Sequence, residues 1–338
     1  MVTMKQLAEL CGVSRGTVDR ALNGRGRVNR KTAEKVRRMA QQTGYAPNPA
    51  GRALAARKNR PVVGVILSSE GNPFFDEVIR GMRDAAAGYA IYGLEVRYCT
   101  MQGYDIERQC DLISELKESA NAIIINPIDD GRVAALLSGC MAEGMFVVTV
   151  NNDLEAGHRH CYVGTDYFNG GETACALMEI LAGRSARLGI VMGSRKVLGH
   201  RRRLEGFRSR MERLPGYQIL EIVENEDDEI RSYDRTKAML AEHPDITAVF
   251  LAAGGVCGAC RAVREVPEER RPVVIAFDSV PSTVEMMRQG IVRAVLYQHP
   301  YRQGHLSMEL AFEYLVNGRE PARREYILKN EIRLLENL

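Results

Sequence analysis

From residue 61 onward, short apolar runs rich in β-branched residues alternate with longer stretches of helical periodicity. The runs read RPVVGVILSS, GLEVRYCT, NAIIINP, MFVVTVN, RLGIVMG, YQILEIVEN, ITAVFLAA, PVVIAFDS and VRAVLYQ. Each run is as long as a strand and continuously apolar, as a strand must be when both faces of its sheet are covered. The alternation therefore predicts an α/β fold with parallel sheets, and 278 residues leave room for two of them.

Polar side chains follow many of these runs, at the point where each predicted strand ends. Ligands of parallel α/β folds bind beyond the carboxyl ends of the strands. Each such residue, taken alone, is more often a helix cap or a turn, but their recurrence indicates a binding cleft. Amides and carboxylates, with the rings of Phe74 and Phe75 for stacking, suit a polyhydroxylated ligand. The polar residues in question are Asn72, Asn126, Asp129, Asn151 to Asp153, Asp166, Asp278 and Gln298.

The charge of the chain is divided unevenly along its length. The net charge is +3, yet the first 60 residues hold 14 Lys and Arg against 3 Asp and Glu, and the remainder holds 32 against 40. A basic module thus precedes a mildly acidic body. Such asymmetry points to a polyanionic partner for the module, although a basic N-terminus can also be a solvated tail.

The basic module has the pattern of a folded three-helix domain. Leu7, Ala8 and Cys11 line one side of a helix that begins near residue 4, and Gly12 breaks that helix. Ser14 can cap a second helix that runs to about Asn23. A third helix follows RGRVNRKT and closes the small core. Two helices joined by a short glycine-containing turn are typical of the helix-turn-helix motif.

The second helix carries the candidate DNA contacts. With Val18, Ala21 and Leu22 inward, Arg15, Gly16, Asp19 and Arg20 face outward. Helix-turn-helix proteins place this helix in the major groove, where arginine can bond the O6 and N7 atoms of guanine together. The alternative is a three-helix domain that binds protein, or nothing. Residues suited to holding phosphates are Thr17, Asn23, Arg25, Arg27 and Lys31.

The segment YAPNPAGRALAARKNRP joins the module to the body. Asn48 can cap a helix and Pro49 can open it, but AGRALAARK is short and has little apolar face. Such a helix would form only against DNA or a partner, with Leu54 as a wedge for the minor groove. An ordinary linker is the alternative, and composition alone favours it.

The stretch from MKQLAEL to LAARK resembles, from end to end, the DNA-binding domain of lac-repressor-family transcription factors. The matching motifs are VS..TV.R.LN, TGY.PN and a hinge segment that ends in LA. The resemblance implies a dimer on a palindromic operator, with paired hinge helices that insert Leu54 into the minor groove. It also implies that Arg15 and Gly16 set specificity and that Arg20 contacts bases. Asp19 departs from the serine of many members.

The body resembles periplasmic sugar-binding proteins of the ribose-binding type. The motifs GNPFF, VTVNN, HRRRLEGF, AFDS and YQHP carry the resemblance. Two departures bear on the ligand: Asn151-Asn152 replaces the usual Asp-Arg pair, and LAAGG replaces the usual Asn-Asp. These departures argue against a simple pentose, while a sugar or polyol stays favoured over a purine. The resemblance implies ligand contacts by Asn72, Phe74, Phe75, Asn151, Asn152, Arg201, Asp278 and Gln298.

Together these patterns predict an N-terminal helix-turn-helix domain with a hinge helix, then a two-lobed, doubly wound parallel-sheet core like a periplasmic binding protein. We expect the DNA-binding domain over 1–58, with the hinge helix at about 48–57, and the effector-binding and dimerisation core over 59–338. The first lobe should span about 60–160 and 299–323, and the second about 161–298 and 324–338. The DNA-binding residues expected are Ser14, Arg15, Gly16, Thr17, Arg20, Asn23, Arg27 and Leu54.

The eight cysteines are expected to be buried thiols of a cytoplasmic protein. Only Cys257 and Cys260 have redox or metal spacing, and neighbours on one helical face explain them better. The longest apolar runs fall short of the roughly 20 residues that span a bilayer, and no secretory signal is evident. No catalytic set, cofactor or metal site emerges.

We therefore predict a transcriptional regulator, most simply a repressor, whose DNA affinity a small sugar or polyol controls. The expected partners are double-stranded DNA with a palindromic operator, the effector and a second copy of the chain. A solute-binding protein for sugar transport is the alternative, against which the basic module argues. An enzyme that uses Cys257 and Cys260 is a third reading.

Overall fold

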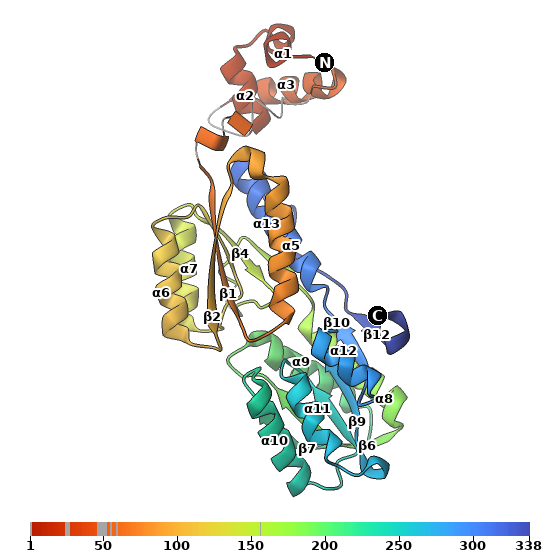
Figure 1. Cartoon of the computed structure of the whole chain (residues 1–338). Helices are drawn as coiled ribbons and strands as arrows, with labels where there is room; N and C mark the ends of the chain where they lie inside the picture. Colours follow the sequence, from red (N-terminus) through yellow and green to blue (C-terminus); the bar gives the residue numbers. More distant parts are fainter. Residues whose placement is uncertain (1, 24–27, 46–52, 55, 59, 156) are drawn as a thin grey trace.

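The computed structural model describes residues 2–23, 28–45, 53–54, 56–58, 60–155 and 157–338. Figure 1 shows the N-terminal helices at one end of an elongated molecule, followed by two lobes that each hold a sheet. In the described part of the chain, no helix is both long enough and apolar enough to cross a bilayer.

Three helices form the N-terminal domain: α1 (Met4–Cys11), α2 (Arg15–Asn23) and α3 (Arg30–Gln42). Thr3 and Gln6 make a capping box at the start of α1, and Gly12, with φ 67°, ends that helix. Leu7, Val18 and Val36 are fully buried between the helices. Each helix is too short to be stable alone, so this shared core holds the domain together.

The first lobe is a six-stranded, wholly parallel sheet in the order β11-β5-β4-β3-β1-β2. Its strands are β1 (Val62–Glu70), β2 (Glu95–Gln102), β3 (Ala122–Ile125), β4 (Phe146–Val150), β5 (Cys161–Gly164) and β11 (Glu325–Ile327). One face packs on α5 (Phe74–Gly88) and α13 (Pro300–Asn317), and the other on α6 (Ile106–Lys117) and α7 (Gly131–Ala142). The turn η1 (Ala90–Tyr92) follows α5.

The second lobe repeats this plan with the order β12-β10-β9-β8-β6-β7. Its strands are β6 (Ser185–Met192), β7 (Gly216–Glu224), β8 (Ala248–Leu251), β9 (Val273–Phe277), β10 (Val292–Tyr297) and β12 (Glu331–Arg333). Helices α8 (Tyr167–Ala182) and α9 (Leu198–Met211) cover one face. Helices α10 (Glu229–Glu242), α11 (Val256–Arg264) and α12 (Pro281–Arg288) cover the other. The short turns are η2 (Glu268–Arg270) and η3 (Leu335–Asn337).

Two details differ from the sequence-based expectation. Cys161–Gly164 and Glu325–Ile327, expected in the second lobe, pair with each other and extend the first sheet beyond β4. The chain therefore changes lobes after β5, after β10 and between β11 and β12. Strand β12 is antiparallel to β10, because it follows β11 after only three residues and begins beside Tyr297 at the carboxyl end of β10.

Candidate functional site

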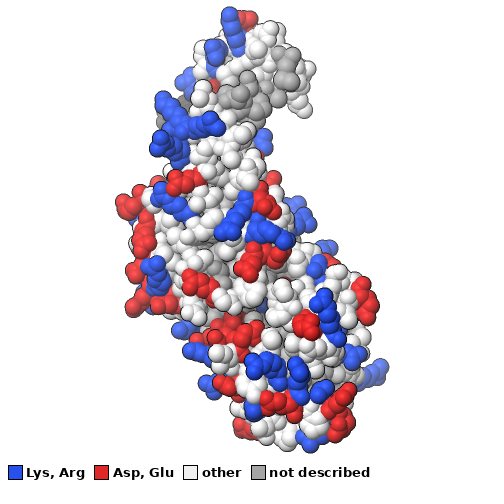
Figure 2. All heavy atoms as spheres, viewed as in Figure 1, with Lys and Arg blue, Asp and Glu red and all other residues white. Residues whose placement is uncertain are grey.

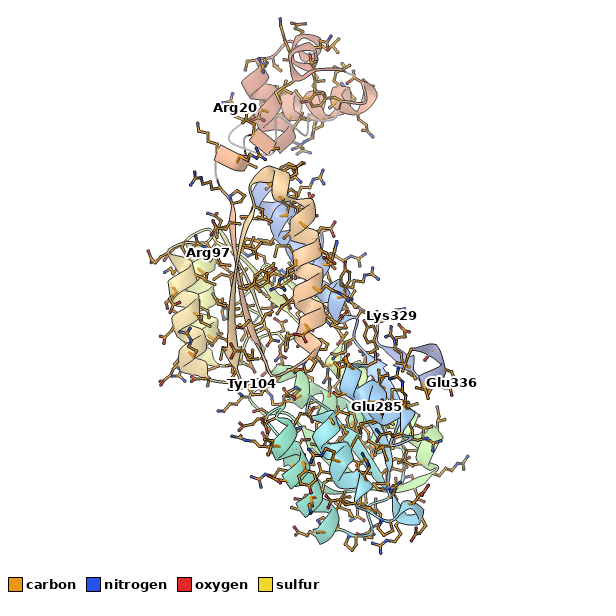
Figure 3. All side chains as sticks on the ribbon, viewed as in Figure 1. Arg20, Arg97, Tyr104, Glu285, Lys329 and Glu336 are labelled. Atoms are coloured by element: carbon orange, nitrogen blue, oxygen red, sulfur yellow. The ribbon has the colours of Figure 1, made fainter. Side chains whose placement is uncertain are left out.

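The N-terminal end of α2 projects from the small domain. Ser14 caps the helix: its Oγ accepts a hydrogen bond from the Thr17 backbone N–H at 3.1 Å and lies 2.9 Å from the Thr17 hydroxyl. Val18 and Ala21 are buried, whereas Arg15, Gly16 and Arg20 are exposed. Figure 3 labels Arg20 on this domain. The outward face is therefore the polar, basic one that the sequence predicts.

Helix α3 fixes the angle at which α2 is held. The Arg37 Nε donates to the Ala21 carbonyl oxygen at 3.3 Å, and Asn29 caps α3 by accepting from the Lys31 N–H at 2.9 Å. Figure 2 shows Lys and Arg side chains gathered around the N-terminal domain, whereas positive and negative side chains are interspersed over the two lobes. A rigid helix thus carries the charge that a phosphate backbone would attract.

Two of the predicted DNA contacts lie outside the described part of the chain. Asn23 is the last residue of α2, but its side chain is not described, and neither is Arg27. Of the predicted hinge helix at about 48–57, residues 48–52 and 55 also lie outside the described residues. Leu54 is described, in a helical turn, and its side chain is 73% exposed.

A cleft between the lobes collects the polar residues at the carboxyl ends of the strands. It is lined by seven of the eight predicted ligand contacts, namely Asn72, Phe74, Phe75, Asn151, Asn152, Asp278 and Gln298. Asn126, from the end of β3, also lines it. Asn72 accepts from the Phe74 N–H at 3.1 Å and so starts α5, which sets the two rings edge to face 5.2 Å apart.

Three non-glycine residues of the cleft have left-handed backbone conformations. Asn151 (φ 62°) follows β4, Asp227 (φ 57°) follows β7 and Asp278 (φ 61°) follows β9. Asn and Asp are the non-glycine residues that adopt this region most readily. Such conformations cluster at ligand sites because the surrounding fold holds them against their strain. Here they aim short polar side chains of both lobes into one cleft.

Arg203 is at the centre of the polar network of the second lobe. The residue is 4% exposed, and its guanidinium donates to the Gln298 Oε1 and to the Ala252 carbonyl oxygen, each at 2.6 Å. Gln298 in turn donates to Asp278, from its Nε2 at 2.5 Å and from its backbone N–H at 3.1 Å. The guanidinium also lies 3.7 Å from the centroid of the Phe277 ring. The Arg203 Nε is buried and has no hydrogen-bond partner among the described residues.

Burial shifts the pKa values of the ionisable cleft residues. It raises the pKa of Asp278 to about 6, although the nearby Arg203 guanidinium acts in the opposite direction. Burial also lowers the pKa of Arg203 and that of His200. The Nδ1 of His200 accepts from the Ser194 N–H at 3.0 Å, as a neutral imidazole can.

Arg201, the eighth predicted contact, does not line the cleft. On α9 the buried positions are Gly199, His200, Arg203, Leu204, Gly206 and Phe207. Arg201 therefore lies on the rim, where it pairs with Asp129 of the first lobe at 2.5 Å. The sequence RRR alone does not show which arginine faces inward. In the structure, Arg203 is the one on the buried face of α9.

Sequence reasoning also missed Tyr104, Tyr167, His200 and Asp227, which all line the cleft. Tyr104 comes from the first lobe and donates its hydroxyl to Asp227 of the second. Figure 3 labels Tyr104 at the junction of the lobes. Its signal was weak, because Tyr104 stands in a loop after β2 rather than at the end of an apolar run.

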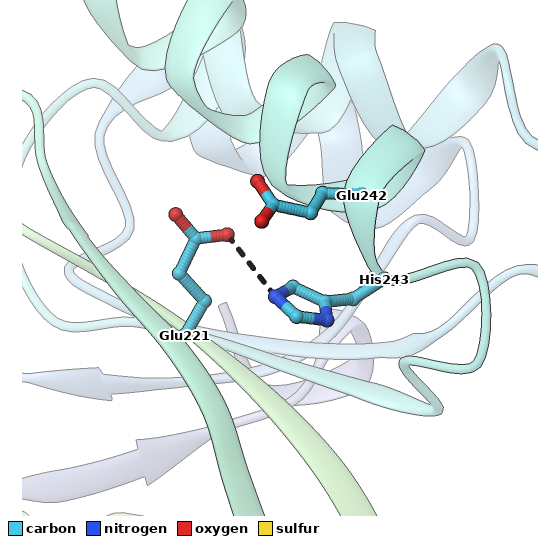
Figure 4. A group of neighbouring side chains, drawn as sticks. All are labelled: Glu221, Glu242 and His243. Atoms are coloured by element: carbon cyan, nitrogen blue, oxygen red, sulfur yellow. Dashed lines mark ion pairs between the residues drawn. The ribbon is translucent and has the colours of Figure 1, made fainter.

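Two other groups of candidate site residues, a pair of cysteines and a Glu/His group, do not line the cleft. Cys257 and Cys260 are free thiols on α11, and burial raises the pKa of both. Among the described residues, one group of three metal-ligand types occurs: Glu221, Glu242 and His243, whose ligand atoms lie within 4.8 Å of one another. Figure 4 shows the His243 Nε2 and Glu221 Oε2 that face each other at 3.7 Å. None of the five residues lines the cleft.

Two family models match separate parts of the chain. The model of bacterial regulatory proteins of the lacI family matches residues 3–48, and the periplasmic binding protein domain matches residues 63–320. The first covers the three-helix domain, and the second covers most of both lobes.

Known proteins resemble about four fifths of the chain. The ribose import binding protein RbsB of Bacillus subtilis is 26% identical over 77% of this chain and 84% of its own length. The ribose operon repressor of Halalkalibacterium halodurans is 25% identical over 83% of this chain and 81% of its own. The structure of GanP, a glucose-galactose binding protein from Geobacillus stearothermophilus, superposes with a TM-score of 0.76 at 20% identity, over 82% of this chain and 98% of that one.

Proposed function

Because this chain belongs to the periplasmic binding protein domain family and carries a lacI-family domain in front of it, it is a DNA-binding transcriptional regulator, and we propose that a small sugar or polyol controls it. We further propose that it acts in the cytoplasm as a homodimeric repressor on a palindromic operator. Each protomer would read one half-site, because a two-fold dimer matches a two-fold DNA sequence.

The exposed face of α2 supports the proposed reading of the operator. Arg15, Gly16 and Arg20 face outward from its first turns and reach base edges, while Ser14 and Thr17 lie at the helix start, where a phosphate binds well. Asn23 and Arg27 would add phosphate contacts. The exposed Leu54 suits insertion into a minor groove.

Unpartnered polar atoms in the cleft carry the proposal for the effector. The Arg203 Nε, Ser68 Oγ and Thr283 Oγ1 are buried without a hydrogen-bond partner among the described residues, and all three residues line the cleft. Leaving a buried donor unpaired costs about 1–3 kcal/mol, so a ligand with several hydroxyl groups would be stabilised by them. Phe74, Phe75 and Phe277 add apolar surface for a sugar ring.

Contacts that cross between the lobes support control by cleft closure. The Gly199 N–H of the second lobe donates to the Asn152 Oδ1 of the first at 2.9 Å, and Tyr104 contacts Asp227. At the other end of the first lobe, Arg57, the last residue of the predicted hinge helix, donates from its Nε to the Ile91 carbonyl oxygen of η1 at 2.8 Å. An effector that prefers one lobe arrangement would shift the population of DNA-binding dimers.

A ligand screen joined to a DNA selection tests this function. The purified chain is screened for a rise in melting temperature with sugars, polyols, sugar phosphates and nucleobases, because a ligand of the native state must raise it. A selection from random-sequence duplexes should recover a palindrome. A protein that binds a sugar but enriches no sequence would be a solute-binding protein for transport, the alternative that the body alone permits. Hits confined to nucleobases or phosphorylated compounds would contradict the sugar or polyol.

A further inference from the structure

The cleft holds more negative than positive side chains. Its lining includes the carboxylates of Asp227, Glu229 and Asp278 but only one guanidinium, that of Arg203. His200 also lines it, but its buried imidazole stays neutral. Carboxylates therefore outnumber positively charged groups among the residues that line the cleft.

Two of the three carboxylates have a source of positive charge beside them. Arg203 is the strongest positive influence on Asp278 and shares Gln298 with it. Glu229 accepts a hydrogen bond from the Gly258 N–H in the first turn of α11, where the aligned backbone amides carry a partial positive charge. These two carboxylates are thus compensated within the protein.

Asp227 interacts with the Arg203 charge only beyond ion-pair distance, and its direct hydrogen bonds come from neutral donors, one of them just before α11. Its Oδ1 accepts from the Gly254 N–H at 2.7 Å and its Oδ2 from the Tyr104 hydroxyl. Among the described residues, no Lys, Arg or His nitrogen lies within 4.0 Å of its carboxylate oxygens. Asp227 is partly exposed, so a ligand that covers it removes its charge from water, and this is costly unless an opposite charge or protonation compensates it.

We propose, on the premise of the effector cleft described above, that the effector is a sugar or polyol that bears a protonated amino group, bound against Asp227. The ammonium supplies the counter-charge when the lobes enclose the ligand, while Arg203, Asp278 and the amides bind its hydroxyl groups. A neutral sugar of the same size leaves Asp227 uncompensated and binds more weakly. Tyr104 reaches Asp227 from the opposite lobe, so an ammonium at this point also contacts the closure interface.

Matched trios of compounds test the charge directly. Each trio holds an amino sugar or aminocyclitol, its neutral hydroxyl parent and its N-acetylated form, drawn from hexoses, pentoses and inositols. Melting temperature and calorimetric affinity are measured at pH 7. We expect at least one amine to bind ten-fold or more tightly than both of its neutral counterparts.

The variant Asp227→Asn and a matched control, Glu226→Gln, assign the effect to one carboxylate. Asparagine keeps an acceptor for the Gly254 N–H, and we expect it to lower affinity for the amine at least ten-fold while leaving any weak binding of the neutral parent. Glu226 is the exposed neighbour, paired with Arg231 outside the cleft, and its variant should keep the preference. Circular dichroism and the ligand-free melting temperature check that each variant folds.

Two outcomes overturn the inference, and they affect the proposed function differently. If neutral sugars bind as tightly as their amines, or if only neutral compounds bind, the amine is wrong while the sugar-controlled regulator stands. If neither an amine nor a neutral sugar or polyol binds, both the amine and the proposed effector class fail.

Discussion

Arg203 and Asp278 come from α9 and from the end of β9, and Gln298 joins them through hydrogen bonds to both. Asp278 and Gln298 could be identified from the sequence because each directly follows an apolar strand. Arg203 could not be identified in this way, because the sequence does not show which of three consecutive arginines faces inward. That depends on how the helix packs on its sheet. Strand-end residues are thus predictable one by one, whereas residues on a helix depend on packing.

Asp278 should make stability depend on pH in a defined direction. Burial raises its pKa from an ordinary 3.8 to about 6, so the folded chain holds this proton more tightly than the unfolded chain does. The contribution is complete below about pH 4 and is lost as pH rises to about 6. It amounts to at most about 3 kcal/mol, at 1.36 kcal/mol per pKa unit.

The measurement is urea unfolding of the wild type and Asp278→Asn at pH 4.5 and pH 7. The variant should lose less stability than the wild type between the two values, because asparagine does not titrate. Equal changes in both proteins would show that Asp278 does not have the raised pKa.

Arg20 should act on sequence discrimination rather than on DNA affinity in general. We expect Arg20→Ala to lose about 1–3 kcal/mol on the selected operator and little on random duplex. Lys31→Ala, a change at an exposed lysine in the first turn of α3, should weaken binding to both DNAs by similar factors and reduce the salt dependence. Fluorescence anisotropy titrations compare the two. Equal losses on operator and random DNA in Arg20→Ala would contradict base reading.

At the scale of elements, α5 and α13 form the closest helix contact of the first lobe. A Cβ at Gly304 would lie 1.9 Å from the Val78 carbonyl oxygen, and one at Gly81 would lie 2.0 Å from that of Tyr301. Both helices begin at the cleft and run toward η1. In η1, the backbone carbonyl of Ile91 accepts the hydrogen bond from Arg57. Tyr89 stacks on Phe312 with ring centroids 3.6 Å apart at that far end. The pair is therefore placed to link the cleft to the hinge.

Gly304→Ala should force these helices apart. Overpacking of this kind typically costs about 1–3 kcal/mol, and backbone atoms, unlike side chains, cannot rotate away. Gly88→Ala is the matched control, because no atom lies within 4 Å of its Cβ position at the exposed end of α5, and it should gain up to about 1 kcal/mol. Urea midpoints give both values. Equal stability in the two variants would contradict the close contact.

Most elements followed from the sequence because their apolar runs are continuous. Strand β5 was missed because Cys161–Gly164 has a single β-branched residue and ends in glycine. Its pairing with β4 and β11 depends on the chain crossing between lobes, which local patterns do not encode. The α2 helix was clear by contrast, since capping, apolar spacing and charge all indicated it.

At the scale of the whole molecule, the division of charge and the two lobes give a consistent account. A basic reader lies at one end, and a cleft that encloses polar groups lies between the lobes. Asp129, Arg201 and Glu155 join the lobes at the rim of the cleft without lining it. The sequence predicted two lobes and a cleft, but the contacts that span them became visible only when both lobes were placed.

The central property proposed for this chain is that a ligand in the cleft changes its affinity for DNA. The measurement is the affinity of the full chain for its selected palindrome with and without the sugar-class ligand found by melting temperature. We predict a change of at least five-fold, which corresponds to about 1 kcal/mol of coupling, and no change for Asp278→Ala, which should still bind the operator. An operator affinity that stays the same when the cleft is saturated would contradict the account.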